Sequence, residues 1–210
     1  MATPSTPLPG AAAASRNPAA HPVWVRATHW VNALAVLIMT ASGWRIYNAA
    51  PLFDFVFPAG ITLGGWLGGA LQWHFAGMWL LAGNGLLYLG CSLASGRLVR
   101  RFFPLSARGI AADLAAALRG RLSHADPRRY NQVQRAAYLF AVIDLVVLVL
   151  SGLVLWKSVQ FETLRTLMGG YEAARYVHFT AMALLMGFVA VHLAMAALVP
   201  RTLMTMIRGR

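Results

Sequence analysis

Residues 176–192 read YVHFTAMALLMGFVAVH, an apolar segment that carries a histidine near each end. The segment lies between Arg175 and Arg201, and this stretch is long enough for a membrane-spanning helix, which needs about 20 mostly apolar residues. At about 100° and 1.5 Å per residue, His178 and His192 lie about 40° apart around such a helix and about 21 Å apart along it. The two imidazoles therefore share one face of the helix and lie at different depths in the membrane.

Three further segments of the chain are apolar enough to cross a bilayer. Only 11% of the 210 residues are charged and 59% are hydrophobic, which is too little charge for the surface of a soluble domain. The sequence therefore predicts an all-α integral membrane protein, a four-helix bundle that forms one domain over residues 23–210 after a disordered tail over residues 1–22. The four expected spans are roughly Ala27–Trp44, Phe75–Gly96, Ala136–Trp156 and Tyr176–Pro200.

A fifth apolar stretch, Phe53–Leu71, is predicted to be an interfacial loop and not a span. It contains Asp54, Pro58 and five glycines, and both proline and glycine disfavour a helix. Trp66 and Trp73 are expected at the depth of the lipid headgroups, where tryptophan is enriched. No internal repeat is visible in the sequence.

The arginines indicate the orientation of the chain. A formal net charge of +12 would suggest nucleic-acid binding in a soluble protein, but arginines close to spans orient a membrane protein and contact anionic lipid. The sequence therefore predicts membrane lipid, and no nucleic acid, as a partner. By the positive-inside rule both termini and the loop between the second and third spans are cytoplasmic, in a multi-pass membrane protein. That loop contains Arg97, Arg100, Arg101, Arg108, Arg119, Arg121, Arg128, Arg129 and Arg135.

Four of the six histidines lie within an expected span or directly at its start, where a polar side chain is costly and a functional role is the default expectation. The single cysteine excludes a cysteine metal cluster, whereas imidazole is a good axial ligand for haem iron. With the expected topology, His29 and His192 lie toward the cytoplasmic face, and His74 and His178 lie toward the outer face. We therefore expect two haems b, each bound by one of these histidine pairs.

Three short motifs, together with the two histidines of the last span, resemble the di-haem cytochrome b subunits that anchor respiratory formate dehydrogenases, nickel–iron hydrogenases and thiosulfate-reductase-type molybdenum enzymes. The resemblance covers about residues 24–208. It implies that the last span gives one ligand to each haem, and that the third motif lies beside a quinone pocket on the cytoplasmic side. The motifs are Arg26-Ala-Thr-His29-Trp30, His74-Phe-Ala-Gly77 and Arg129-Tyr130-Asn131-Gln-Val-Gln134-Arg135.

The sequence allows more than one role for several polar residues. Arg26 could bind a haem propionate or act as a simple positive-inside anchor. Asn131 and Gln134, beside Tyr130, could donate hydrogen bonds to a quinone or cap the third span. Asp144, in the middle of that span, could belong to a proton path or a partner-binding site, or could be a protonated or hydrogen-bonded acid that faces the bundle.

Two bis-histidine haems have no open coordination position, so the sequence predicts electron transfer and not substrate chemistry at iron. The expected function is to transfer electrons between the quinone pool and a redox partner enzyme, a periplasmic molybdenum-type oxidoreductase. One alternative is a stand-alone cytochrome b that oxidises quinol with a small oxidant. A ferric or flavin reductase-like domain typically carries two histidines on each of two helices, which this chain does not. A transporter that uses the histidines for protons is the third alternative.

Overall fold

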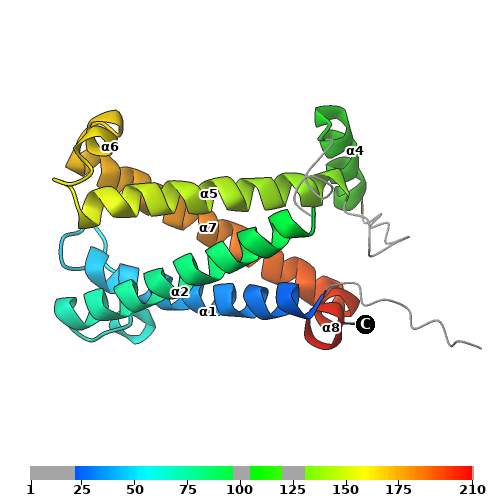
Figure 1. Ribbon diagram of the computed structural model, residues 1–210, viewed down its shortest axis with the longest axis horizontal. Helices are drawn as coiled ribbons and strands as arrows, with labels where there is room; N and C mark the ends of the chain where they lie inside the picture. The colour runs from blue at the N-terminus through cyan, green and yellow to red at the C-terminus, as the bar shows by residue number, and fades with distance from the viewer. Residues whose placement is uncertain (1–21, 97–104, 120–130, 210) are drawn as a thin grey trace, which may run out of the picture.

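The computed structural model describes residues 22–96, 105–119 and 131–209, and every regular element in these ranges is helical (Figure 1). The predicted all-α class is thereby confirmed. The predicted tail over residues 1–22 lies outside the described residues, except for Pro22, which precedes the first helix. In chain order the elements are α1 (Val23–Tyr47), the short 3-10 helix η1 (Ala59–Ile61), α2 (Leu67–Ala94), α4 (Ala107–Leu118), α5 (Gln132–Trp156), α6 (Glu162–Leu167), α7 (Tyr171–Leu198) and α8 (Pro200–Arg208).

Four of the described helices, α1, α2, α5 and α7, are long and apolar enough to span a membrane, which confirms the predicted number of spans. They form two hairpins, α1 with α2 and α5 with α7. In Figure 1, α1 and α5 run along opposite edges of the bundle, and α2 and α7 cross obliquely between them. We call the end that carries the α1–α2 connection and α6 the loop end. The opposite end, with the start of α1, α4 and α8, is the tail end.

Within the first hairpin, a glycine and an amide side chain bring α1 and α2 together. A Cβ atom on Gly77 would lie 2.7 Å from Met39 Cγ, so a larger residue there would require the Met39 side chain to move. The side-chain nitrogen of Asn84 donates to the Thr28 carbonyl oxygen at 2.8 Å and to Asn32 Oδ1 at 2.6 Å. These bonds satisfy a buried polar group that lipid could not.

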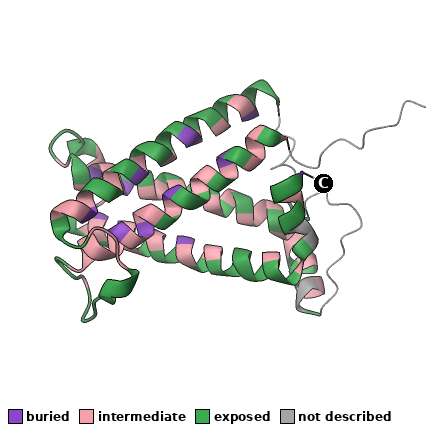
Figure 2. Ribbon diagram, turned by 90° about the horizontal axis from the view of Figure 1, so that it is seen from below, coloured by how far each residue is buried: buried purple, intermediate pink, exposed green. Residues whose placement is uncertain are grey.

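The outer surface of the bundle is apolar, as expected where lipid replaces water. Leu37, Leu86 and Val191 lie within three different spans and are 66%, 71% and 64% exposed. In Figure 2 the buried positions are scattered along the faces where the helices meet, and the outward faces are exposed. A soluble bundle would need polar side chains on those outward faces, so this surface agrees with a membrane environment.

The structure corrects the predicted start of the second span, because α2 begins at Leu67, inside the stretch that was predicted to be a loop. Two glycines at the start of this helix are required by close contacts. A Cβ atom on Gly68 would lie 2.3 Å from the Trp66 ring, and one on Gly69 would lie 2.3 Å from the Gly64 carbonyl oxygen. The glycine-rich composition therefore reflects tight packing where the helix begins, and not a break in the helix.

The loop before α2 forms an aromatic cluster at the loop end, made of Tyr47, Phe53, Phe55, Phe57 and Phe179. The Tyr47 ring lies 5.3 Å from Phe55 and 5.1 Å from Phe179, centroid to centroid. The Phe53 ring lies 5.3 Å from Phe179 and 6.1 Å from Phe55. Phe179, which follows His178 in the sequence, joins this cluster to α7.

At the tail end, α8 is bound to the first turns of α1. Arg26 Nη1 donates to the Ile207 carbonyl oxygen at 2.8 Å, and Trp30 Nε1 donates to the Met206 carbonyl oxygen at 3.4 Å. Gly209 ends α8 with a φ of 80°, and the Arg26 guanidinium packs against it. The cation thus satisfies a carbonyl at the C-terminus of α8, where the helix dipole favours positive charge.

Candidate functional site

The structure brings the four histidines of the spans together in two pairs. The imidazole centroids of His74 on α2 and His178 on α7 are 6.5 Å apart, and we call these the loop-end pair. The centroids of His29 on α1 and His192 on α7 are 6.0 Å apart and form the tail-end pair. These are the pairings expected from helix depth. Each pair joins the two hairpins, and the pairs lie about 21 Å apart along α7.

Each separation fits two imidazoles on opposite sides of one metal. An imidazole nitrogen lies about 2 Å from a bound metal and about 1 Å from the centre of its own ring, so two such rings have centres about 6 Å apart. Within the described residues, no group of three or more His, Cys, Asp or Glu side chains converges on one point. Two imidazoles alone would leave a bare ion short of ligands. A haem supplies the remaining ligands from its own ring, so the donor set of each pair fits a haem.

Open space beside a glycine and unpaired N–H groups near the histidine pairs also fit a haem, which is a flat ring with carboxylate groups. Gly85 lies about 20° around α2 from His74, and a Cβ atom there would meet nothing within 4 Å. Two buried N–H groups, Arg26 Nε and Trp44 Nε1, have no hydrogen-bond partner among the described residues. Arg26 lies one turn before His29 on the same face of α1. Such donors match the carboxylate groups of a haem.

The loop-end pair is held by hydrogen bonds from the neighbouring helix of its own hairpin. His74 Nδ1 lies 3.1 Å from Ser42 Oγ and 3.1 Å from the Met39 carbonyl oxygen, both on α1. His178 Nδ1 lies 2.9 Å from Ser151 Oγ on α5. Both histidines are therefore anchored through Nδ1, which leaves Nε2 as the nitrogen that could bind a metal.

Glycines next to these serines let the imidazoles lie against the helix backbone. A Cβ atom on Gly43 would lie 3.5 Å from His74 Cε1, and one on Gly152 would lie 3.4 Å from His178 Cε1. The atoms of any larger side chain would extend beyond that Cβ toward the ring. Each Ser-Gly pair thus forms a cradle in which the serine binds the imidazole nitrogen and the glycine admits its edge.

The tail-end pair is held by packing. The His192 ring stacks on Phe188, with centroids 6.0 Å apart and planes inclined by 15°. The His29 ring meets Trp30 edge-on at 5.4 Å. Within the described part of the chain, no residue makes a hydrogen bond to the ring nitrogens of His29 or His192. The tail-end pair also lies nearer to the bound helix α8, through Trp30.

Of the remaining predicted site residues, Arg26, Asn131 and Gln134 lie at the tail end. Asn131 caps α5: its Oδ1 accepts from the Gln134 backbone nitrogen at 2.7 Å, and Gln134 Oε1 accepts from the Asn131 backbone nitrogen at 3.1 Å. This capping box matches one of the two explanations considered for these residues, and it uses only their side-chain oxygens. Tyr130 lies outside the described residues. Arg26 binds α8, as above, and a role toward a haem remains a prediction.

The Ser-Gly cradles were not predicted from the sequence. Their positions show that the two hairpins are related as an internal repeat with two-fold symmetry. Ser42 and Ser151 each lie five residues before the last residue of α1 and of α5. His74 and His178 each lie seven residues after the first residue of α2 and of α7. Hairpin α1–α2 therefore corresponds to hairpin α5–α7, in agreement with their crossing arrangement in Figure 1. The detectable signal was the Ser-Gly dipeptide near the end of the first and third spans.

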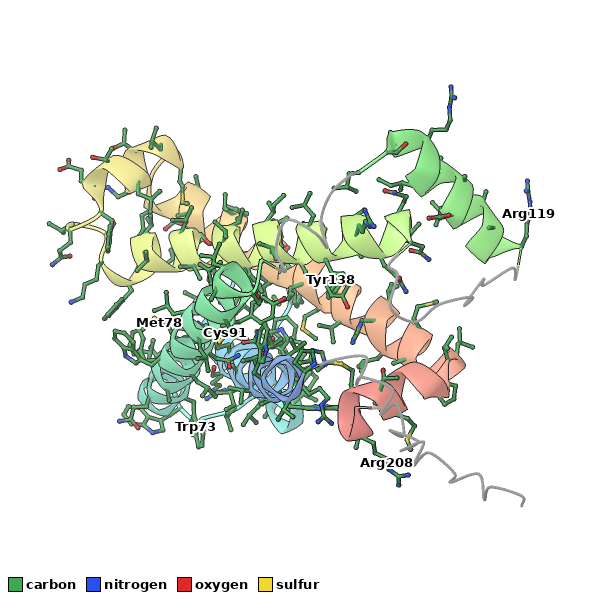
Figure 3. The ribbon with its side chains drawn as sticks, turned by 45° about the vertical axis from the view of Figure 1, so that its right-hand side comes forward. Trp73, Met78, Cys91, Arg119, Tyr138 and Arg208 are labelled. Carbon is green, nitrogen blue, oxygen red and sulfur yellow. The ribbon has the colours of Figure 1, made fainter. Side chains whose placement is uncertain are left out.

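The two-fold relation is broken at the tail end. His29 lies 13 residues before Ser42, and the matching position before Ser151 is Tyr138, which Figure 3 shows on the side of α5 that faces the bundle. His192 lies 14 residues after His178, and the matching position after His74 is Tyr88. Two tyrosines thus occupy the positions equivalent to the tail-end histidines. The repeat therefore offers one bis-histidine pair at this end and not two.

Asp144 lies apart from both histidine pairs. It is 5% exposed, and its Oδ2 atom has no hydrogen-bond partner among the described residues. It lines a cavity of about 280 Å³ between α5 and α7, with Thr180 and apolar side chains, and none of the four histidines lines this cavity. The carboxyl group thus faces a groove between two helices. Of the explanations considered for Asp144, a hydrogen-bonded acid has no partner for Oδ2 within the described residues, and a protonated acid stays a prediction.

Comparison with known proteins agrees with this arrangement. The sequence profile of the prokaryotic cytochrome b561 family matches residues 20–209, which include all four spans and both histidine pairs. A protein of Azospira oryzae, provisionally named protein-methionine-sulfoxide reductase subunit YedZ1, is 66% identical to this chain over 191 residues. That similarity covers 91% of this chain and 96% of the relative. The predicted membership of a cytochrome b membrane-anchor family is thereby confirmed, and the chain belongs to the prokaryotic cytochrome b561 family.

Proposed function

We propose that this chain is a di-haem cytochrome b of the bacterial inner membrane that transfers electrons between the quinone pool and a periplasmic oxidoreductase. The observation that carries the proposal is the pair of bis-histidine arrangements along α7, with centroid separations of 6.5 and 6.0 Å. Each haem would supply a one-electron carrier without an open coordination position. Because the two pairs lie about 21 Å apart, they span most of the hydrocarbon core, which is about 30 Å thick.

The chain's own residues have distinct tasks in this proposal. His74 and His178 would hold one haem, and His29 and His192 the other. The apolar outer faces of the spans keep the bundle in lipid and exclude water from the space between the hairpins. Arg26, one turn from His29, would place positive charge beside the tail-end haem.

We propose that the redox partner is a molybdenum-type enzyme that reduces methionine sulfoxide in proteins. The support is the Azospira oryzae relative, whose name describes a subunit of a protein-methionine-sulfoxide reductase. The partner would dock at the loop end, which the positive-inside rule predicts to be periplasmic. The aromatic cluster presents apolar surface there, since Phe53 and Phe55 are each 45% exposed.

We propose that the quinone binds at the tail end, beside the start of α5. The capping box uses the side-chain oxygens of Asn131 and Gln134, which leaves their NH₂ groups as donors for a quinone oxygen. Both side chains are exposed. Tyr130, which precedes them, would complete this set of polar groups. Water at the tail end would exchange the protons that quinone chemistry requires.

A stand-alone quinol-oxidising cytochrome b is the second candidate. The observation that favours it is that one chain contains all four ligands, so that electron transfer across the membrane needs no second subunit. Such a protein would reoxidise rapidly with a small oxidant in the absence of any partner. The partner-dependent function instead requires that reoxidation depends on the catalytic subunit.

The proposal is tested with the purified chain in lipid nanodiscs. A pyridine haemochrome assay should give about two haems b per chain, as four axial imidazoles require. A quinol analogue should then reduce both haems, and the catalytic subunit with a methionine-sulfoxide substrate should reoxidise them. One haem or none would overturn the di-haem assignment. Rapid reoxidation by superoxide without the catalytic subunit would favour the stand-alone function.

A further inference from the structure

The proton on each loop-end imidazole is determined by the hydrogen bonds of two serines. Ser42 Oγ lies 2.7 Å from the Ile38 carbonyl oxygen, and Ser151 Oγ lies 2.7 Å from the Val147 carbonyl oxygen. A serine hydroxyl has a single hydrogen, which these carbonyls receive because a carbonyl can only accept. The lone pairs of each Oγ atom then face the histidine.

The histidine nitrogen that meets each serine must therefore carry a hydrogen. His74 Nδ1 also lies 3.1 Å from the Met39 carbonyl oxygen, which again can only accept. On α5, the Ser151 hydroxyl, whose hydrogen is donated to a carbonyl, meets His178 Nδ1 at 2.9 Å. Both imidazoles are thus Nδ1–H donors, and their Nε2 atoms keep the lone pairs that bind a metal.

A hydrogen bond donated from the second ring nitrogen makes an imidazole more electron-rich, and so a stronger ligand for the oxidised metal. The loop-end pair has two such ligands, one from each half of the internal repeat. Within the described residues, neither tail-end imidazole has a protein acceptor of this kind. The two haem sites therefore differ in the atoms that surround their ligands, although both have two histidines.

We propose that Ser42 and Ser151 are positioning residues that hold both loop-end ligands as Nδ1–H donors and thereby lower the midpoint potential of the loop-end haem. This inference rests on the proposed di-haem function. The serines act through the histidines, and they do not themselves contact the iron. The glycine beside each serine lets the imidazole come close enough for this bond, as the 3.5 and 3.4 Å Cβ distances indicate.

The test is a redox titration of Ser42→Ala, Ser151→Ala and the double variant, followed by optical difference spectra. The titration is made in the His29→Ala background, where only the loop-end haem is expected to remain, and in the otherwise unchanged chain. Loss of a ligand's hydrogen-bond partner typically changes metal affinity about tenfold or more. A tenfold weaker preference for ferric iron raises a one-electron potential by about 59 mV. We expect a positive shift of this order for each serine and a larger shift for the double variant.

Two further variants separate this role from packing. Ser92→Ala is the matched control, because Ser92 on α2 is 1% exposed and its Oγ has no partner among the described residues. It should leave the loop-end potential unchanged. Ser42→Cys and Ser151→Cys replace the oxygen with a slightly larger sulfur that is a weaker acceptor, so they should give intermediate shifts. If the alanine variants lose the haem, the cysteine variants still decide the question.

The low-spin EPR spectrum provides a second measurement, since it reports the orientation of the two axial imidazoles. Their planes are inclined by 66° in the loop-end pair, and loss of a serine anchor should change the signal of this haem and not that of the other. Unchanged loop-end potentials and spectra in the alanine variants that keep their haem, or in the cysteine variants, would overturn the inference. So would equal shifts of both haems. Fewer than two haems in the unmodified chain would instead overturn the proposed function.

Discussion

The loop-end and tail-end histidine pairs have almost the same separation, 6.5 and 6.0 Å, but their surroundings differ. At the loop end, each imidazole is bound through Nδ1 by a serine of the adjacent helix. At the tail end, the rings contact Trp30 and Phe188, and nothing in the described chain binds their nitrogens. Similar ligand spacing can thus be reached by directed hydrogen bonds or by ring packing.

This difference follows from the internal repeat. The loop-end site lies where α2 and α7 correspond, so each hairpin contributes the same Ser-Gly and histidine unit. The tail-end site joins α1 to α7, which are not equivalent in the repeat. The positions that the two-fold relation makes equivalent to its histidines are occupied by Tyr88 and Tyr138. The loop-end site therefore depends on contacts within each hairpin. The tail-end site depends on how α1, α7 and α8 lie relative to one another.

The largest effect is expected from removing a ligand. His74→Ala and His178→Ala should each lose the loop-end haem and keep the other, because the remaining pair is about 21 Å away along α7. His29→Ala and His192→Ala should both lose the tail-end haem. Redox-titrated difference spectra of the four variants show which component disappears. If His29→Ala and His74→Ala lost the same component, the pairing would be wrong.

A bulky side chain in a cradle should act on the loop-end haem alone. Gly43→Val and Gly152→Val would place methyl groups beyond a Cβ position that already lies 3.5 or 3.4 Å from the imidazole, and such overpacking costs about 1–3 kcal/mol. We expect the loop-end haem content to fall and the tail-end haem to remain, in a haemochrome assay combined with difference spectra. Gly90→Val on α2 is the control, because its Cβ atom would meet nothing within 4 Å. Equal loss in the control would indicate general misfolding.

The sequence was sufficient for the class of fold, because the dominant signals are local. Long uncharged segments, the arginine-rich middle loop and the depth of each histidine predicted four spans and two pairings. The predicted start of α2 was wrong. Glycine disfavours a helix, but the close packing around Gly68 and Gly69 outweighs this unfavourable propensity. That packing involves Gly64 and Trp66, which lie outside the helix and which a propensity argument does not consider.

The hydrogen bonds around the sites could not be predicted from the sequence. Ser42 and His74 are 32 residues apart, and Ser151 and His178 are 27 residues apart, so each contact depends on how the hairpin helices are rotated. The repeat was not recognised either, because the identities between its two halves, such as Ser42-Gly43 with Ser151-Gly152 and His74-Phe75 with His178-Phe179, are scattered among apolar residues that any two spans could share. The bond from Arg26 to Ile207 spans 181 residues and required the position of α8.

Arg26→Ala is expected to have a smaller effect, and this effect should fall on the tail-end haem and not on the loop-end haem. The substitution removes a charge-assisted bond to the end of α8, which at an exposed site is worth about 1 kcal/mol. Because α8 is bound next to His29 and Trp30, the tail-end haem should transfer faster to a haem-scavenging protein, and the loop-end haem should not. Arg26→Lys keeps the charge but not the planar fork, so it should be intermediate. Faster loss of the loop-end haem would contradict this role of α8.

The smallest expected effect separates a helix cap from a quinone ligand at the same residues. Asn131→Ala removes the cap of α5 and should cost about 1 kcal/mol of stability, measured by thermal unfolding in detergent. Asn131→Asp keeps the oxygen that caps the helix and removes the NH₂ group, so it should preserve stability. Gln134→Glu does the same for the other half of the capping box.

These matched variants decide the proposed quinone site because cap and ligand use different atoms of one side chain. If the NH₂ groups bind a quinone oxygen, Asn131→Asp and Gln134→Glu should slow quinol-linked haem reduction while unfolding temperature and haem content stay unchanged. The new carboxylates would also repel a quinone oxygen, so the loss should exceed that of the alanine variants, which only remove the donor. If the residues serve only as a cap, both acidic variants should reduce at the normal rate. Normal rates in the acidic variants, with both haems bound, would rule out these donors and place the quinone elsewhere in the bundle.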